Sequence, residues 1–330
     1  MEIHAGTAAR KSPEERVALV GTPNVGKSVI FGLLTGTYAT VSNYPGTTVE
    51  VTRGNAVVHG RRLECIDTPG INSIVPMSED EQVTRNILLA ERPLTVLQVA
   101  DSKNLARALL ITLQMAELEL PVILDLNMVD EARDRGIRLD TRALGRALGV
   151  EVVRTVAPER KGLAELRRAL AGGAAAVPSA AVRYPKIIED YAGRIAALLP
   201  PAAGPGRALA LMVLSRDETL GPRLRCALEP AAIETVERLR GECERAFARP
   251  VGPAIHEARL RRAHELADAV TTRIAASPYP IMRILGTACT HPLWGAFALA
   301  AVLLGLYAFV GVLGAGVLVD LFEDGLFNGY

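Results

Sequence analysis

The stretch GTPNVGKS, which spans Gly21 to Ser28, decides the fold of this chain. It matches the phosphate-binding pattern G-x-x-x-x-G-K-[ST] at every required position. An apolar β-type run, Val17–Val20, precedes it, and a helical pattern, Val29–Leu34, follows it. Strand, loop and helix in this order direct backbone N–H groups at a polyphosphate. The sequence therefore predicts a loop that binds a nucleoside triphosphate, with the contacts Gly21, Asn24, Val25, Gly26, Lys27 and Ser28.

Two side chains of the loop and a second motif predict a magnesium site. We expect Lys27 to reach the β- and γ-phosphates and the Ser28 hydroxyl to ligate Mg²⁺. The segment DTPG, Asp67 to Gly70, follows an apolar run and matches D-x-x-G. Its carboxylate would hold the Mg²⁺ shell through water, and the Gly70 N–H would sense the γ-phosphate. The structural alternative is an aspartate that only caps the next turn.

A third motif predicts which base is bound. The segment NMVD, Asn127 to Asp130, follows the apolar run Val122–Leu126 and matches the guanine-reading pattern N-x-x-D. The Asp130 carboxylate can accept from both the ring N–H and the exocyclic amine of guanine, whereas adenine would leave it unpaired. Many GTPases have lysine at the second position, where this chain has Met128. A strand-terminal turn capped by Asp130 is the alternative.

A loop with Pro and Gly, Ser42 to Thr48, precedes an apparent strand and suits a switch segment that closes over γ-phosphate and Mg²⁺. Thr47 or Thr48 would supply the second hydroxyl ligand, and the residues alone favour neither. A plain turn is the competing interpretation.

The segment after D-x-x-G lacks the side chain that often orients the attacking water. A glutamine that orients the attacking water often follows D-x-x-G, but here the position is Ile71. An apolar side chain cannot orient water, so we expect slow intrinsic hydrolysis, with acceleration from backbone, a bound cation or a partner. Arg53 stays open as a catalytic arginine.

Strands and amphipathic helices alternate from Arg16 to about Ala171. This alternation predicts an α/β fold with a mostly parallel sheet covered by helices on both faces. Ligands then bind at the carboxyl ends of the strands. The predicted strands are Val17–Val20, Val49–Val58, Leu63–Ile66, Leu94–Val99, Val122–Leu126 and Val150–Val153, and further helices are predicted at Glu79–Ala90, Lys103–Leu118, Thr141–Leu148 and Leu163–Ala171.

The composition changes at AGGAAAVP, Ala171 to Pro178, a small-residue linker. Beyond it, helical periodicity interrupted by prolines predicts a small all-α domain. The predicted organisation is a disordered tail (1–15), a G domain (16–175), a helical domain (176–283) and a transmembrane segment with a short tail (284–330). The helices predicted in the second domain are Lys186–Leu199, Arg207–Leu214, Ala231–Phe247 and Ala254–Ala275.

The stretch from Ile284 to Val319 contains no Asp, Glu, Lys or Arg. Leu293 to Val319 alone exceeds the roughly 20 apolar residues that span a bilayer, and Trp294 suits an interfacial anchor. A buried helix of a soluble domain is the alternative. Basic residues before the segment and acidic residues after it place the preceding domains in the cytoplasm by the positive-inside rule.

The bulk composition argues against several other classes. A net charge of +1 gives no electrostatic case for a nucleic-acid partner. The four cysteines are scattered without a C-x-x-C pair, which fits reduced thiols rather than a disulfide framework or zinc site. The N-terminus lacks the apolar core of a secretory signal.

The motifs together resemble the ferrous iron transport protein B (FeoB) family, whose cytoplasmic portion is a G domain followed by a helical domain. The specific likeness lies in Pro45-Gly46-Thr47-Thr48-Val49-Glu50 and in the NMxDEA form of the guanine reader, Asn127 to Ala132. The other matching segments are GTPNVGKS, DTPG, Ser78-Glu79-Asp80-Glu81, Leu113-Gln114 and His291-Pro292-Leu293-Trp294-Gly295.

The resemblance implies roles for particular residues. Thr48 takes the role of the switch threonine on Mg²⁺, and Asn24 matches an asparagine associated in the family with K⁺ near the β- and γ-phosphates. A cation there could neutralise developing charge in place of an arginine. The family's guanine-contacting loop falls at Thr155, Val156 and Ala157, where Val156 replaces the usual serine and puts base affinity or nucleotide release in doubt.

The resemblance also implies cofactors, partners and location. It implies GTP or GDP with Mg²⁺ and K⁺, Fe²⁺ as the transported ion, and a place in the bacterial cytoplasmic membrane. Family members continue through many spans that build the iron path. We therefore expect this chain to be an N-terminal fragment, or a short form that needs a separate membrane partner. Other expected partners are a small accessory transport protein and further copies of the chain.

Two other functions stay open on the sequence: a GTPase of ribosome or RNA assembly, and a membrane-tethered nucleotide sensor without transport. An apolar C-terminal span without a basic appendage argues against the first, and Ile71 leaves room for the second. Cys289 and His291 could ligate iron, but a buried thiol and a capping imidazole are the interpretation we favour. Glu234 and Glu237 fit a solvated helix face.

Overall fold

The computed structural model describes residues 15–36, 39–173, 175–274 and 286–311. It divides into two compact units, residues 1–274 and 275–330. The predicted disordered tail, 1–15, lies outside the described residues except for Glu15, which begins the first strand. The last part of the apolar stretch, from residue 312, also lies outside them.

A seven-stranded sheet forms the centre of the described part of the first unit, in the order β2-β3-β4-β1-β5-β6-β8. Its strands β4, β1, β5, β6 and β8 are parallel, whereas β3 is antiparallel to both β2 and β4. The predicted mostly parallel sheet is therefore confirmed. The strands are β1 (Glu15–Gly21), β2 (Ala39–Asn43), β3 (Glu50–Val58), β4 (Arg61–Asp67), β5 (Thr95–Asp101), β6 (Val122–Asn127) and β8 (Glu151–Arg154).

Helices cover both faces of this sheet because its central strands are apolar on both sides. In β1, Val17 and Leu19 belong to one hydrophobic core, with residues of α1 and α6, while Ala18 and Val20 belong to another, with residues of α2, α3 and α5. The helices are α1 (Lys27–Thr35), α2 (Glu79–Glu91), α3 (Leu105–Glu117), the short α4 (Val129–Asp134), α5 (Thr141–Leu148) and α6 (Leu163–Ala171).

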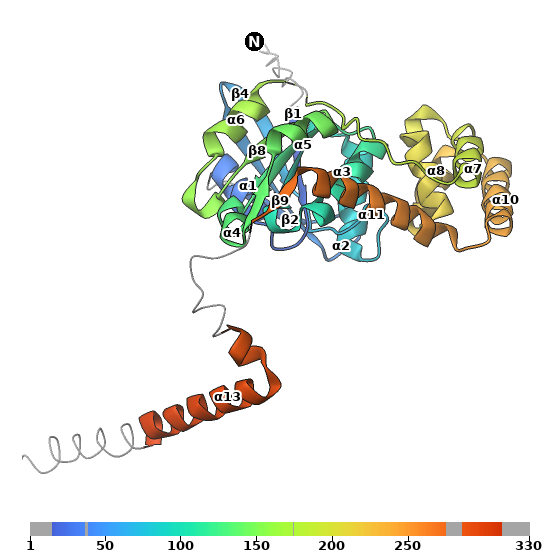
Figure 1. Ribbon diagram of the computed structural model, residues 1–330. Coiled ribbons are helices and arrows are strands. Elements are labelled where there is room, and N and C mark those ends of the chain that lie inside the picture. The colour runs from blue at the N-terminus through green and yellow to red at the C-terminus, as the bar shows by residue number, and fades with distance from the viewer. Residues whose placement is uncertain (1–14, 37–38, 174, 275–285, 312–330) are drawn as a thin grey trace, which may run out of the picture. The chain divides into compact units, whose positions relative to one another are not determined.

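The helical part follows an extended linker and returns to the sheet domain. Figure 1 shows α7, α8 and α10 gathered beyond α3, and α11 running back towards the sheet. After α11, strand β9 (Thr271–Arg273) pairs with β7 (Ile137–Leu139) of the sheet domain. The helices are α7 (Lys186–Ala196), α8 (Gly206–Leu214), α9 (Gly221–Ala227), α10 (Pro230–Ala246) and α11 (Val251–Val270).

Two buried ion pairs join the helical part to the sheet domain. Arg85 of α2 pairs with Asp217, and each side chain is 1% exposed. Arg259 of α11 donates to Glu117 of α3 at 2.7 Å, and its Nε donates to the Tyr184 hydroxyl at 3.0 Å. Charges this deeply buried are costly unless paired, so they fix how the two parts meet.

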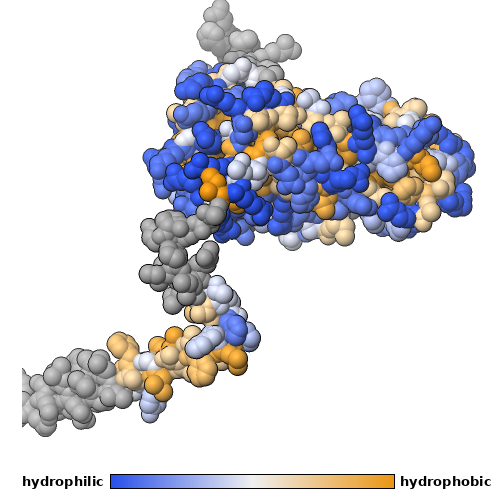
Figure 2. Space-filling view, viewed as in Figure 1, coloured by the Kyte–Doolittle hydropathy of each residue, from blue (hydrophilic) through white to orange (hydrophobic). Residues whose placement is uncertain are grey.

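In the second unit, helix α13 is apolar on every side. Helix α13 spans Pro292–Tyr307, and the helical segment Pro292–Gly311 is long and apolar enough to cross a membrane. Its large apolar side chains are exposed, including Leu304 at 73% and Tyr307 at 74%. Figure 2 shows this helix as largely hydrophobic, in contrast to the mainly hydrophilic surface of the first unit.

Candidate functional site

The phosphate loop connects β1 to α1 as the sequence predicts. Asn24 and Gly26 have left-handed backbone, with φ of 64° and 87°. A Cβ on Gly26 would lie 2.4 Å from Nδ2 of Asn127, so glycine is needed both for conformation and for space. A cavity of about 400 Å³ lies over the loop, lined by Thr22, Pro23, Asn24, Gly26, Lys27, Ser28, Val29, Gly70 and Asp80.

The structure brings two of the predicted magnesium ligands, Ser28 and Asp67, together at the end of β4. The Ser28 hydroxyl donates to Oδ2 of Asp67 at 2.7 Å, and Lys27 forms an ion pair with Oδ1 of the same carboxylate. A hydroxyl and a carboxylate at hydrogen-bond distance are hard oxygen ligands suited to Mg²⁺, so these residues fit the metal. Asp67 would hold the metal's water shell, and Lys27 would turn from Asp67 to the phosphates.

Asn127 ties three segments of the site together. Its Nδ2 donates to the carbonyl oxygen of Val25 in the phosphate loop, at 2.9 Å. Its Oδ1 accepts from the N–H of Ala157 at 3.0 Å and lies 3.2 Å from the Thr155 hydroxyl oxygen. Asn127 therefore connects the predicted loop Thr155 to Ala157 with the phosphate loop.

Asp130 has an unused acceptor. Its Oδ1 is buried and has no hydrogen-bond partner among the described residues. A buried acceptor without a partner is costly, and two donors on a guanine edge would satisfy it. Met128, directly before α4, has a left-handed backbone with φ of 60°.

The two candidate switch threonines differ in the structure. The Thr47 hydroxyl donates to the Tyr44 carbonyl at 2.9 Å and accepts from the Val49 N–H at 3.3 Å, so it closes a local turn. Thr48 is exposed. Of the two, Thr48 has the hydroxyl that is not committed to this turn, although it does not line the cavity over the phosphate loop.

The segment after Gly70 is pinned by side chains whose roles the sequence analysis missed. Glu81 accepts from the N–H groups of Asn72 and Met77, at 3.0 and 2.8 Å. Gln114 accepts from the Ile74 N–H at 3.0 Å. The S-x-x-E spacing that ends in Glu81 is a capping-box signature, and it could have indicated an ordered start for α2.

Neither Ile71 nor Arg53 supplies a catalytic side chain in this structure. Ile71 is 0% exposed, and its N–H donates to the Gly21 carbonyl at 2.9 Å. Arg53 forms ion pairs with Glu91 at 2.5 Å and Glu64 at 3.1 Å. The hydrogen bond to Glu91 raises the pKa of Arg53 most. The possibility that Arg53 is a catalytic arginine therefore finds no support here.

A buried carboxyl that the sequence analysis did not single out lies beneath the guanine-reading segment. Asp125 of β6 is 0% exposed, and its Oδ1 accepts from the Thr155 hydroxyl at 2.7 Å. Its Oδ2 has no partner among the described residues. Burial raises the pKa of Asp125 to about 7.

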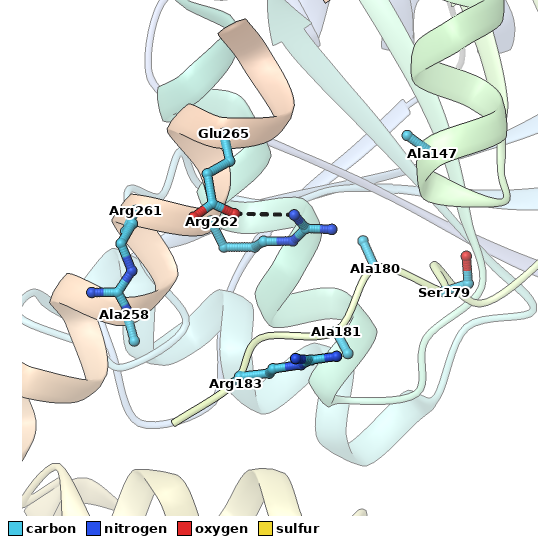
Figure 3. Close-up of a pocket in the computed structure, with 9 residues that line it drawn as sticks. All are labelled: Ala147, Ser179, Ala180, Ala181, Arg183, Ala258, Arg261, Arg262 and Glu265. Atoms are coloured by element: carbon cyan, nitrogen blue, oxygen red, sulfur yellow. Dashed lines mark hydrogen bonds and ion pairs between the residues drawn. The ribbon is translucent and has the colours of Figure 1, made fainter. Parts of the chain in front are cut away.

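A larger cavity, of about 530 Å³, lies elsewhere, between α5, the linker before α7, and α11. Figure 3 shows Arg183, Arg261 and Arg262 around it, with Arg262 paired to Glu265 at 3.1 Å. None of the predicted nucleotide contacts lines it. The predicted nucleotide site is therefore separate from this larger cavity.

The candidate iron ligands do not form a cluster. In the described ranges no group of three or more His, Cys, Asp or Glu side chains could hold a metal ion. Nδ1 of His291 accepts from the Leu293 N–H at 3.3 Å and caps α13. This is the capping role that the sequence analysis favoured. Cys289 is exposed, not buried as that interpretation assumed.

The fold and these motifs define a P-loop GTPase domain followed by a helical domain. The family model for ferrous iron transport protein B matches residues 15–170, and the model for the FeoB cytosolic helical domain matches residues 184–272. The chain therefore belongs to the FeoB family.

Curated relatives are much longer than this chain. The Fe(2+) transporter FeoB of Shigella flexneri is 30% identical over 271 residues, which are 79% of this chain and 34% of that protein. An Fe(2+) transport protein A/FeoB fusion protein of Porphyromonas gingivalis is 44% identical over 152 residues, which are 46% of this chain and 18% of that protein. The chain thus spans about a third or less of their length.

Solved structures match the first unit. A crystal structure of a GDP-bound mutant of S. thermophilus NFeoB has a TM-score of 0.69 at 28% identity, and covers 78% of this chain and 99% of that chain. The cytosolic domain of L. pneumophila FeoB has a TM-score of 0.69 at 25% identity, with 78% and 100% covered.

Proposed function

We propose that this chain is the GTP-binding, slowly GTP-hydrolysing cytoplasmic module of a ferrous iron transporter, tethered to the bacterial cytoplasmic membrane by the segment 284–330. The observation that carries the proposal is the buried, unpartnered Oδ1 of Asp130, in a segment that Asn127 ties to the phosphate loop. Guanine supplies the donors that this acceptor lacks. The GDP-bound relative supports the same nucleotide class.

In this proposal the G domain (16–175) holds the nucleotide through the loop Gly21–Ser28, through Asn127 to Asp130 and through Thr155 to Ala157. Mg²⁺ is held by Ser28, Thr48 and, through water, Asp67. K⁺ bound by the exposed Asn24 supplies positive charge at the phosphates, in place of an arginine. Hydrolysis is slow because the buried Ile71 cannot orient water.

The helical domain (176–283) relays the nucleotide state. Gly70 senses the γ-phosphate, and the segment behind it is bonded to Glu81 at the start of α2. One turn further along α2, Arg85 pairs with Asp217 of the helical part. We infer that a change in the segment after Gly70 reaches the helical domain through α2, because α2 contacts both. The rest of an iron path comes from other membrane segments.

Calorimetry on the full chain in mild detergent tests the nucleotide part. GDP should bind at least about 100-fold more tightly than ADP, because adenine leaves Asp130 unpaired. Equal affinities would reject guanine selectivity.

Uptake of Fe²⁺ tests the transport part. Cells without their own ferrous uptake would express the chain alone or with candidate membrane partners. GTP-dependent uptake with a partner supports the proposal. Nucleotide binding without uptake under any combination would favour a membrane-tethered nucleotide sensor.

A further inference from the structure

The ammonium group of Lys103 lies beside the guanine-reading segment although it comes from a different strand. Lys103 belongs to the short 3₁₀ helix η1 (Ser102–Asn104), which directly follows β5. Its Nζ is 2.5 Å from Oε2 of Glu131 and 3.3 Å from Sδ of Met128. The Lys103 side chain is only 11% exposed. A charge that is largely withdrawn from water needs such partners.

The segment that carries Lys103 is itself fixed. Asp101 accepts from the Lys103 N–H at 2.9 Å and from Nδ2 of Asn104 at 2.8 Å. The buried Ser102 hydroxyl donates to the carbonyl oxygen of Asn127 at 2.6 Å. Lys103 therefore extends from a segment that hydrogen bonds hold in place. Ser102, the residue before it, is itself bonded to Asn127 of the guanine-reading motif.

Lys103 contacts the turn that contains Asp130. Met128 is left-handed, with φ of 60°, a conformation that needs support in a residue other than glycine. Asp130 lies between Met128 and Glu131, and both of these contact Lys103. Because the contacts flank Asp130 on both sides in sequence, we expect loss of the ammonium to loosen the first turn of α4.

We propose that Lys103 is a positioning residue that sets the affinity and selectivity of this site for guanine. It supplies, from the neighbouring loop, an ammonium group to a motif that has Met128 where many GTPases have lysine. The inference rests on the proposed nucleotide function, and concerns which residue controls base recognition.

The test compares GDP with inosine diphosphate, which lacks the exocyclic amine and so offers Asp130 one donor instead of two. Calorimetry with the full chain in detergent would measure both affinities for wild type, Lys103→Met and Lys103→Arg. Lys186→Met, an exposed lysine in the helical part, is the matched control. Lys103→Met should weaken GDP binding about tenfold, the effect of one charge-assisted hydrogen bond. The ratio of GDP affinity to inosine diphosphate affinity should also fall. Lys103→Arg should keep both the GDP affinity and this ratio close to those of wild type.

Unchanged GDP affinity in Lys103→Met would overturn the inference, as would an equal loss for both nucleotides, which indicates general damage rather than base positioning. If Lys103→Met does not fold, Glu131→Gln probes the same bond from a half-exposed side chain, and the same two outcomes decide. A wild-type chain that binds neither nucleotide would instead reject the proposed function.

Discussion

The buried carboxyl of Asp125 gives the sharpest prediction about stability. Burial raises its pKa from 3.8 to about 7, and it has no cationic partner among the described residues. Between these two values the unfolded chain releases a proton that the folded chain keeps. The contribution of Asp125 to folding stability is therefore fully present below about pH 4 and is lost as the pH rises through about 7.

The size of the effect follows from the two pKa values. A difference of about three pH units corresponds to about 4 kcal/mol over the full range, and about 3 kcal/mol of this remains to be lost above pH 5. Asp125→Asn keeps the shape of the protonated acid but cannot ionise. We expect wild type to lose about 3 kcal/mol of stability relative to this variant between pH 5 and pH 8.

Urea unfolding of the full chain in detergent, followed by circular dichroism, measures this difference. Asp190→Asn, an exposed change on α7, is the control and should show the pH dependence of wild type. If wild type and Asp125→Asn change in parallel with pH, Asp125 is not a buried carboxyl with a raised pKa, and the reasoning is refuted.

The remaining predictions concern the loop and the relay. Lys27→Ala should abolish triphosphate binding while circular dichroism stays unchanged; retained binding would reject the loop assignment. GTP hydrolysis should be faster in K⁺ than in Na⁺, and Asn24→Ala should remove the difference; equal wild-type rates in both salts would remove the cation proposal. Arg85→Met should cost about 3–5 kcal/mol because the buried Asp217 carboxylate loses its only cationic partner among the described residues. Adding Asp217→Leu should recover part of this loss in urea unfolding, because it removes the buried charge but also the bonds from Thr219. No recovery would show that the ion pair does not couple these positions.

Local patterns predicted most of the sheet domain. The run Val17–Val20 and the loop that follows it predicted β1 and the start of α1. The helix predicted at Thr141–Leu148 has the same bounds in the structure. Strand β2 (Ala39–Asn43) was missed because all five of its residues are exposed, so it carries no apolar alternation. The short α4 and α9 were missed because a few residues give too little periodicity.

The site was predictable in its motifs but not in its contacts. The spacing of Gly21, Lys27 and Asp67 within their motifs predicted their roles in the site. Nothing in the sequence shows that Arg53 is held by two glutamates, or that Lys103 reaches Glu131, which lies 28 positions away. Such pairs depend on which strands become neighbours, which is a property of the folded sheet rather than of any local window.

Asp130 offers the most direct test of the central claim, that this site selects guanine through one carboxylate. Asparagine at this position can donate to the 2-oxo group of xanthine, which replaces the guanine amine. Calorimetry of the full chain should show GDP favoured over xanthosine diphosphate in wild type, and the reverse preference in Asp130→Asn. An unchanged preference for GDP in Asp130→Asn would contradict the account.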